Sequence, residues 1–165
     1  MKLLVATDGS RGGRAAVRFA ARAATECRSP EVVVITVGAL RRELLFAHPE
    51  TPAGLTLWPE LEKLERELAG RVLRDAEKDL KRSRVKARLR FVESRRLGPV
   101  ADAIANEADR ERADLIVVGT EGHGALPTFA LGSVSARLLH IANRPVAVQQ
   151  NGDFLLRLRL FNKNS

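Results

Sequence analysis

The chain has 165 residues, 45% hydrophobic and 29% charged, a composition typical of a globular protein and not of a disordered one. A chain of this length buries roughly 70% of the surface that its unfolded form exposes, so it can hold a core without metal or disulfide. Its single cysteine, Cys27, excludes an intramolecular disulfide, and its net charge of +8 favours phosphate-bearing or other anionic partners.

The first part of the chain predicts two buried strands on either side of an arginine-rich helix. Residues 2–7, with the continuous apolar run Leu3-Leu4-Val5-Ala6, and residues 31–37, which are β-branched almost throughout, are typical of strands in a parallel sheet that is covered on both faces. Between them, residues 10–27 predict an alanine-rich helix with Ser10 as its N-cap. The polar side of this helix carries three arginines at helical spacing: Arg14, Arg18 and Arg22.

The middle of the chain predicts a long loop, a helix and an edge strand. Residues 38–59 contain three prolines and two glycines; a connection this long is often a lid, and a loop packing on its own apolar residues or a partner surface is the alternative. Residues 61–81 place leucines on one side of a helix. Residues 85–91 alternate apolar and basic side chains, which favours a half-exposed edge strand over a nucleic-acid-binding stripe.

Strand and helix signals continue to alternate in the second half. They predict a helix at 98–112, a strand at 114–119, a glycine-punctuated loop at 119–132, a helix at 133–142 and a strand at 145–148. This alternation predicts the α/β fold class, with residues 1–150 forming one doubly wound domain around a parallel sheet. Residues 151–165 form an extension that could be an added strand, a partner-binding arm or a disordered end.

The glycines after the strand at 114–119 predict an anion-binding loop. Gly119 can adopt backbone angles closed to other residues and leaves room for a ligand against the backbone. Gly122 and Gly124 let successive amides converge into an anion-binding nest. Gly132 and Ser133 stand where the helix at 133–142 begins, and there the N–H groups of residues 133–135 and the helix dipole favour an anion. The Ser133 hydroxyl adds a donor, although as an N-cap it could serve the helix instead.

Two common phosphate-binding motifs do not fit this loop. Gly119 and Gly124 have P-loop spacing, but Ala125 and Leu126 stand where that motif requires lysine and a hydroxyl residue. The dinucleotide-binding fingerprint begins at Gly122 and fails at Pro127, which replaces its third glycine. The loop instead joins two glycine clusters through nine intervening residues.

The pattern Gly119-x-x-Gly122, nine residues, then Gly132-Ser133 resembles the ATP-binding signature of the universal stress protein family. The resemblance covers about residues 1–150 and includes three further segments: Leu3-Leu4-Val5-Ala6-Thr7-Asp8-Gly9-Ser10, Ala113-Asp114-Leu115-Ile116-Val117-Val118-Gly119 and Arg144-Pro145-Val146. It implies a five-stranded parallel sheet of order 3-2-1-4-5 with helices on both faces. Ligands of such sheets bind at the topological switch point, which would place Asp8 and Gly119 across one crevice.

The resemblance also implies ATP as the ligand and gives individual residues roles. Asp8 would hydrogen-bond the ribose, although without the resemblance it reads as a turn or helix-start residue. Val37 would meet adenine through its backbone, and Ala6 and Thr7 would line the base pocket. Glycines, Ser133 and Val134 would hold ribose and phosphates, with Val118 beside them. The full candidate set is Ala6, Thr7, Asp8, Val37, Val118, Gly119, Gly122, His123, Gly132, Ser133, Val134 and Ser135.

The loop departs from the family pattern in its charge. Residues 123–131 contain no lysine or arginine, whereas related proteins often carry basic residues there, and His123 is their one titratable donor. Glu121 adds negative charge close to the expected phosphates. The phosphates would therefore be held weakly, or by backbone amides together with Mg²⁺.

The sequence favours a nucleotide-dependent regulator in stress response over an enzyme. Phosphoryl transfer needs charge clamps and a positioned nucleophile, and the chain shows neither a P-loop lysine nor an acidic pair for a metal. His48, His123 and His140 lack metal-ligand spacing, so no metal ligand can be assigned. Slow ATP hydrolysis stays open, and no catalytic residue is assigned.

Partners and location follow from the resemblance and the composition. The family implies a homodimer through the strand at 145–148. The alternatives are a nucleotide-free scaffold or a basic protein that binds nucleic acid through residues 81–96. We rank nucleic acid below small anions because aromatics are only 4% of the chain. No signal-type region or run of 18 apolar residues occurs, so we expect a cytoplasmic protein without membrane contact.

Overall fold

One mixed sheet with helices on both faces organises the chain. The computed structural model describes residues 1–38, 58–93, 99–120, 131–150 and 154–155. Their strands are β1 (Lys2–Ala6), β2 (Glu31–Val37), β3 (Ala87–Val92), β4 (Leu115–Gly119), β5 (Val146–Gln149) and β6 (Phe154–Leu155). Their helices are α1 (Arg11–Thr25), α4 (Trp58–Arg82), α5 (Val100–Glu111) and α6 (Ser133–Ile141).

The strands lie in the order β3-β2-β1-β4-β5-β6. The first five are parallel, so the predicted order 3-2-1-4-5 is confirmed. Central β1 pairs on both sides, with Leu4 opposite Val33 of β2 and opposite Ile116 of β4. A strand with neighbours on both edges and helices on both faces has no polar side, which explains the continuous apolar runs.

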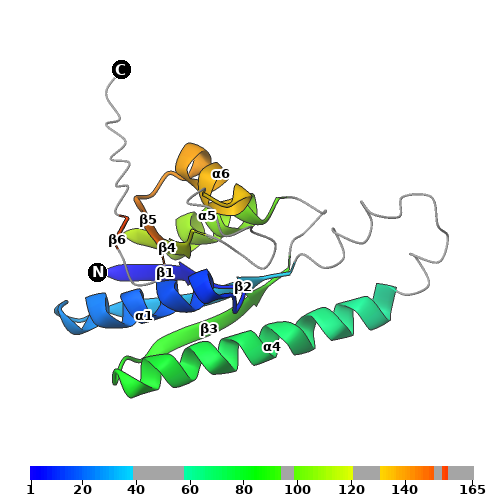
Figure 1. Cartoon of the computed structure of the whole chain (residues 1–165), viewed down its shortest axis with the longest axis horizontal. Helices are drawn as coiled ribbons and strands as arrows, with labels where there is room; N and C mark the ends of the chain where they lie inside the picture. Colours follow the sequence, from blue (N-terminus) through cyan, green and yellow to red (C-terminus); the bar gives the residue numbers. More distant parts are fainter. Residues whose placement is uncertain (39–57, 94–98, 121–130, 151–153, 156–165) are drawn as a thin grey trace.

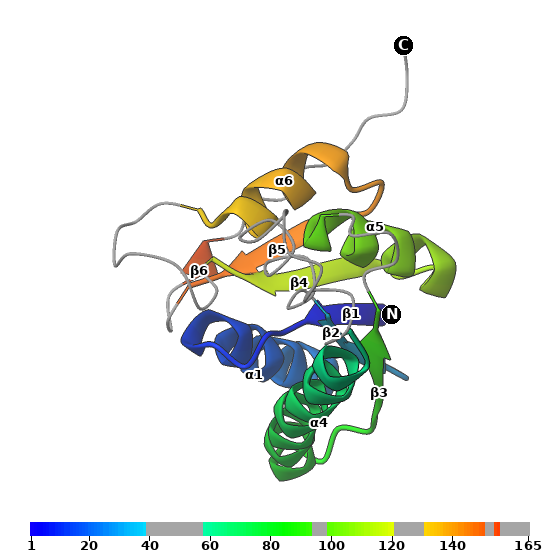
Figure 2. The same ribbon diagram turned by 90° about the vertical axis from the view of Figure 1, so that its right-hand side faces the viewer.

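Helices α1 and α4 lie on one face of the sheet and α5 and α6 on the other (Figures 1 and 2). Two hydrophobic clusters fill the space between the sheet and these helices. Alternate residues of β1 point to opposite faces, as the pleat requires: Leu3 and Val5 pack with α1 and α4, whereas Leu4 and Ala6 pack with α5 and α6. On α1 the buried residues are mostly alanine, so this helix lies close to the sheet. The predicted cap is confirmed, because the Ser10 hydroxyl oxygen accepts the Gly13 N–H at 3.1 Å.

The element boundaries differ from the prediction by a few residues. Helix α4 begins at Trp58, inside the segment predicted to be irregular, because Pro59 falls in the first turn, where its missing N–H is not needed. Strand β3 runs from Ala87 to Val92 and is the outermost strand on its side, so the predicted edge strand is confirmed. Helix α5 ends at Glu111, and its C-cap residue Arg112 adopts a left-handed backbone with φ of 51°.

Part of the C-terminal extension forms an added strand, β6, which is one of the three alternatives that the sequence left open. It pairs antiparallel with β5, placing Leu155 opposite Val148. This is the outer edge of β5, through which we predict a homodimer, so at Val148 a partner strand would compete with β6. The lid predicted within 38–59 concerns residues 39–57, which lie outside the described ones. No helix in the described ranges is long and apolar enough to cross a membrane.

Candidate functional site

The candidate residues that the structure describes gather at one edge of the sheet. Thr7 and Asp8 follow β1, Val37 ends β2 and Gly119 ends β4, and parallel strands end at the same edge. The chain builds outward from β1 through β2 to β3 and then restarts on the other side at β4, so this edge contains the topological switch point. The start of α6 is tied to the same edge, because the Gly132 N–H donates to the Thr120 carbonyl oxygen at 2.7 Å.

Two candidates lie outside the described residues. Gly122 and His123 belong to the segment 121–130, which begins directly after Thr120. Their predicted roles, in the anion-binding nest and as a titratable donor, therefore stay predictions.

The turn between β1 and α1 satisfies its own amides. The Thr7 hydroxyl accepts the Gly9 N–H at 3.2 Å, and the Asp8 carboxylate accepts the Ser10 N–H at 2.9 Å. Gly9 has φ of +80°, a conformation that side chains disfavour and glycine adopts freely. Asp8 therefore performs the turn role that its position predicts. Its side chain is also exposed at the switch point, where a carboxylate can accept hydroxyl donors.

The start of α6 contrasts with that turn. Its N-cap is Gly132, which has no side chain to accept an amide, and the first helical bond runs from the Ala136 N–H to the Gly132 carbonyl oxygen at 2.9 Å. In the described part of the chain, the amides of residues 133–135 precede this bond and have no helical acceptor. The sequence left open whether Ser133 caps the helix. The structure makes it the first helical residue and exposes it, so its hydroxyl does not cap the helix.

Ser135 has a structural role that the sequence did not reveal. Its side chain is 2% exposed, and its hydroxyl lies 3.1 Å from the Thr120 carbonyl oxygen and 2.9 Å from that of Gly132. Either oxygen can accept its single proton. Thr120 in turn donates its N–H to the Gln149 carbonyl oxygen at 2.8 Å. Ser135 and Thr120 therefore fix α6 against β4 and β5, and only the backbone N–H of Ser135 is left to meet an anion.

The end of β2 directs backbone groups toward the space beyond β1. The Thr7 N–H donates to the Ile35 carbonyl oxygen at 3.0 Å, whereas the Gly38 N–H donates to Val92 of β3 at 2.9 Å. Neighbouring residues of a strand direct their backbone groups to opposite sides, so those of Val37 point to the β1 side, where β1 has ended. This geometry agrees with the predicted backbone contact between Val37 and a base.

Three candidates keep their side chains in the core. Ala6 and Val118 are buried, and Val37 packs against the same cluster on the α5 and α6 face. A ligand at the sheet edge would therefore meet the backbone of these residues. Thr36, which the sequence did not single out, anchors the neighbouring segment by donating its hydroxyl proton to the Thr7 carbonyl oxygen at 2.8 Å.

Gly119 is required by packing between β4 and α1. A Cβ atom at this position would lie 2.4 Å from the carbonyl carbon of Gly12, a distance that real atoms never approach. The sequence attributed this glycine to unusual backbone angles and to ligand clearance. Among the described glycines only Gly9 has a positive φ, so unusual angles are not the reason. The Gly12-Gly13 pair at a helix start, unfavourable for helix propensity, was the available signal for this close approach.

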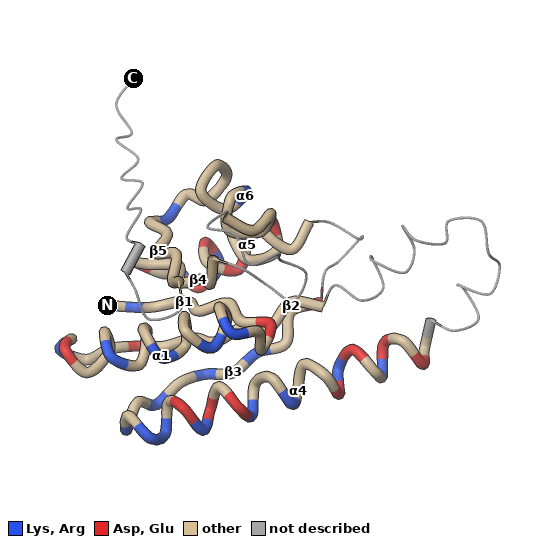
Figure 3. The backbone as a smooth tube through the Cα atoms, viewed as in Figure 1, with Lys and Arg blue, Asp and Glu red and all other residues tan. Residues whose placement is uncertain are grey.

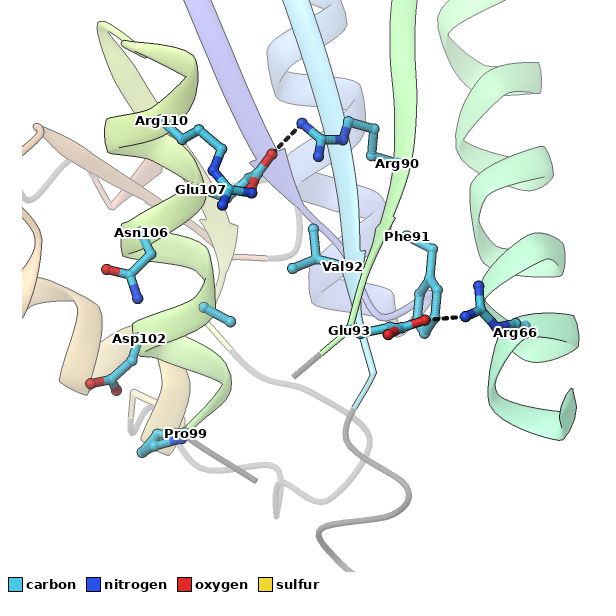
Figure 4. A pocket seen from close by; sticks show the side chains of 11 residues that line it. Arg66, Arg90, Phe91, Val92, Glu93, Pro99, Asp102, Asn106, Glu107 and Arg110 are labelled. Carbon is cyan, nitrogen blue, oxygen red and sulfur yellow. Dashed lines mark hydrogen bonds and ion pairs between the residues drawn. The ribbon is translucent and has the colours of Figure 1, made fainter. Parts of the chain in front are cut away.

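A hollow among the described residues lies elsewhere, between β3 and α5 (Figure 4). Its volume is about 620 Å³, and none of the candidate residues lines it. Glu107 on its wall is 3% exposed, forms ion pairs with Arg90 and Arg110, and leaves Oε1 without a hydrogen bond of good geometry. Arginine and carboxylate are balanced along this wall, so it shows no excess charge for a nucleotide.

The basic side chains of β3 are paired within the molecule. Arg88 donates to Glu111 at 2.6 Å, and Arg90 contacts Glu111 at 3.0 Å as well as Glu107. These carboxylates belong to α5, about 20 residues further along the chain, so the local pattern could not reveal them. Pairing of this kind supports the edge-strand interpretation of residues 85–91 over a stripe of free cations.

We expect the pairing of Glu111 to make stability depend on pH. The hydrogen bond from Arg88, more than the charges of Arg88 and Lys2 and the bond from Arg90, holds the pKa of this carboxyl below its ordinary value of 4.5, although burial opposes the shift. A carboxyl whose pKa is lowered by folding stabilises the fold above its unfolded pKa, and this contribution is lost as pH falls through the folded pKa.

Glu111→Gln is therefore expected to lower the free energy of unfolding by about 1.5–3 kcal/mol at pH 7, the range for a hydrogen bond to a charged group. At pH 3 the difference from the native chain should shrink. Urea unfolding of both chains at the two pH values measures it. A loss of equal size at both values would show that packing, and not the ionised carboxylate, explains the effect.

The described residues contain no group of three or more His, Cys, Asp or Glu side chains that could hold a metal ion. The chemistry at the sheet edge is instead that of binding. The start of α6 offers amides without a side-chain cap and a hydroxyl, the β1–α1 turn carries an exposed carboxylate, and the end of β2 presents its backbone to the space beyond β1. This combination suits a ligand that carries both an anionic group and hydroxyl or base donors.

Comparison with known proteins agrees with this fold. The model of the universal stress protein family matches residues 1–149. The universal stress protein YxiE of Bacillus subtilis (strain 168) is 30% identical over 150 residues, which cover 89% of this chain and 97% of YxiE. The solved structure of the hypothetical protein MJ0577 is 26% identical with a TM-score of 0.71, and the match covers 91% of this chain and 96% of that one.

A further solved structure shows the same fold with a ligand. It is a universal stress protein in complex with cAMP, 24% identical to this chain with a TM-score of 0.58. The match covers 92% of this chain and 97% of that one.

Proposed function

Because the chain belongs to the universal stress protein family, we propose that it binds an adenine nucleotide, ATP first of all, at the sheet edge between β1 and β4. We further propose that nucleotide occupancy regulates its action in stress response. The observation that carries the proposal is the contrast between two segments at this edge of the sheet. The β1–α1 turn uses its own oxygens to satisfy its amides, and the α6 start leaves its amides uncapped.

This contrast suggests which part of the nucleotide each segment binds. Uncapped amides at the positive end of a helix dipole attract phosphate, and the Ser133 hydroxyl can add a donor. The exposed carboxylate of Asp8 repels phosphate and accepts hydroxyl protons, so it suits the ribose. The backbone of Val37 points into the space beyond β1 and suits the edge of a base. A universal stress protein of the same fold has been solved in complex with cAMP, which supports a nucleotide as the ligand.

Phosphate binding in this proposal depends on the backbone. Ser133 and Val134 supply amides to the phosphates, and Gly132 keeps the helix start free of a competing side chain. Gly122 and His123 would close the site from the segment 121–130. A Mg²⁺ ion bound with ATP would supply the positive charge that this loop lacks, since residues 123–131 carry no lysine or arginine. The homodimer through β5 belongs to the same proposal.

A nucleotide panel tests the proposed function. Thermal unfolding of the whole chain is followed with ATP, ADP, AMP and cAMP, each with and without Mg²⁺. A ligand present at 100 times its dissociation constant stabilises the folded state by about 2.7 kcal/mol, a shift that such melts resolve easily. We expect ATP to raise the melting temperature more than AMP does, because the α6 amides bind the phosphates.

GTP is the matched control for base recognition, since it differs from ATP only in the base. Equal shifts with ATP and GTP would overturn base recognition by Val37 but leave the phosphate site standing. No shift with any nucleotide, and no nucleotide released from heat-denatured protein, would overturn the proposal and favour the nucleotide-free scaffold.

A further inference from the structure

Helix α1 presents a row of arginines to solvent. Arg11, Arg14, Arg18 and Arg22 are all exposed, whereas the opposite side of the helix is buried against the sheet. The row, defined by these four residues, extends over about 16 Å at 1.5 Å per residue. Figure 3 shows Lys and Arg at successive turns of α1 and acidic residues only near its two ends.

The charges of this row have no ion-pair partner among the residues that the structure describes. Helix α1 contains no acidic residue, and none of the ion pairs among the described residues involves its arginines. Arg14 donates to the Gly9 carbonyl oxygen, which leaves its charge intact. Helix α4 differs, because its bases pair with acids on the same helix: Arg66 with Glu62, Lys78 with Asp75, Lys81 with Glu77 and Arg82 with Asp79.

Asp75 on α4 interacts electrostatically with the row but already forms an ion pair with Lys78. The hydrogen bond from Lys78 does most to lower the pKa of Asp75, and the charges of Arg74 and Arg14 add smaller effects. Asp75 therefore lies near Arg14, but its main partner is Lys78. The neighbouring helix presents mixed charges beside the row, since Lys78 is paired with Asp75.

The row is unfavourable for the helix that carries it. Arg14, Arg18 and Arg22 repel one another at i,i+4 spacing. Arg11 and Arg14 stand in the first turn, where the helix dipole disfavours positive charge and where α1 has no acidic residue. Solubility alone does not require a row of like charges, because a helix face with mixed charges, such as that of α4, is equally well solvated. Arginine, with its planar fork of donors, is also the side chain best suited to phosphate.

We propose that the arginine row of α1 binds the phosphate backbone of double-stranded nucleic acid without reading its sequence. A line of like charges complements a linear polyanion, and phosphate contacts require no aromatic side chain. We rank nucleic acid low from the sequence because the chain has few aromatic residues. That scarcity disfavours binding of single strands, which stack their bases on aromatic side chains, but it does not disfavour binding of duplexes. This surface lies on α1 and is independent of the proposed nucleotide function.

A lipid surface fits the same row less well. The apolar side of α1 is buried in the core, so the helix cannot insert into a bilayer as interfacial helices do. A flat membrane would also meet the acids of α4 beside the row, whereas a narrow polyanion can follow α1 alone. The membrane is therefore an outcome of the test and not the proposal.

The test compares two double variants of the whole chain. Arg18→Gln/Arg22→Gln removes two charges from the row. Lys63→Gln/Lys86→Gln is the matched control, because it removes the same charge from exposed positions that take part in none of the ion pairs among the described residues. Fluorescence anisotropy with two labelled 20-base-pair DNA duplexes of unrelated sequence, in about 50 to 200 mM salt, measures the affinity.

The row variant should bind both duplexes about tenfold more weakly at 100 mM salt, and the slope of log K against log salt should fall by about 1.8, or 0.9 per lost phosphate contact. The control should keep the native slope. Equal losses in both variants would overturn the proposal, as would row-dependent binding to phosphatidylserine vesicles without binding to duplexes. The row variant should have a melting temperature equal to or above that of the native chain, because it relieves repulsion between arginines. Weaker DNA binding could then not be explained by unfolding of the variant.

Discussion

Replacing Ser133 with glutamate should weaken ATP binding by about 30-fold, which corresponds to about 2 kcal/mol. Ser133 is the first residue of α6, and its side chain is exposed at the uncapped helix start. A carboxylate there satisfies the same amides that the phosphates would use and repels the phosphates directly. Either effect alone amounts to about 1 kcal/mol at a partly exposed helix start. Isothermal titration with ATP measures the change.

Two further variants separate charge from size. Ser133→Gln has nearly the volume of Ser133→Glu but no charge, and it should retain most of the affinity. Ser133→Ala removes only the hydroxyl and should cost a few-fold, the range for one hydrogen bond. The glutamate variant should melt no lower than the native chain, because acidic residues stabilise a helix start. Unchanged ATP affinity in that variant would exclude α6 as the phosphate site.

The sequence predicts the strands of this fold well because their signal is local. The run 32–35 inside the segment 31–37 is apolar at four successive positions, a pattern typical of a strand buried on both faces. The order of the strands came from the family resemblance, because periodicity does not say which strands are neighbours. The boundary of α4 was misjudged because Pro59 reads as a breaker, although the first turn of a helix tolerates it.

The candidate site was predictable in position and less so in detail. That Asp8 and Gly119 meet at one edge follows from the parallel order of their strands. The N-cap of α6 is Gly132 and not Ser133 because two contacts fix the helix start at the Thr120 carbonyl oxygen. The Gly132 N–H donates to this oxygen, and the Ser135 hydroxyl lies within hydrogen-bonding distance of the same oxygen. Thr120 and Ser135 are 15 residues apart, so the pattern around Ser133 alone could not show which residue caps.

The pairing of charges shows the same limit more strongly. Arg88 and Arg90 read as free cations along the sequence, yet Glu107 and Glu111 on α5 bind them. The arginines of α1 read only as the polar side of a helix, yet no ion pair among the described residues engages them. Charge composition therefore predicts the class of partner, whereas the folded arrangement decides which arginines remain available to it.

Replacing Gly119 with alanine should lower the free energy of unfolding by about 3 kcal/mol, at the upper end for an overpacked site. The added Cβ would lie 2.4 Å from the carbonyl carbon of Gly12 and 2.7 Å from its oxygen. Both are backbone atoms, so no rotamer change can relieve the contact, and α1 must move away from β4. That movement also shifts the Asp8 turn, so ATP affinity should fall together with stability.

Gly70→Ala is the matched control for that experiment. Gly70 lies inside α4, and a Cβ atom there would meet only the end of the Arg74 side chain at 3.2 Å, which can move aside. Alanine in a helix interior is favoured over glycine by about 0.5–1 kcal/mol, so this variant should be as stable as the native chain or more so. Urea unfolding measures both. If Gly119→Ala stays within about 0.5 kcal/mol of the native chain, the range of harmless surface changes, then α1 is free to shift and does not fix the Asp8 turn against β4.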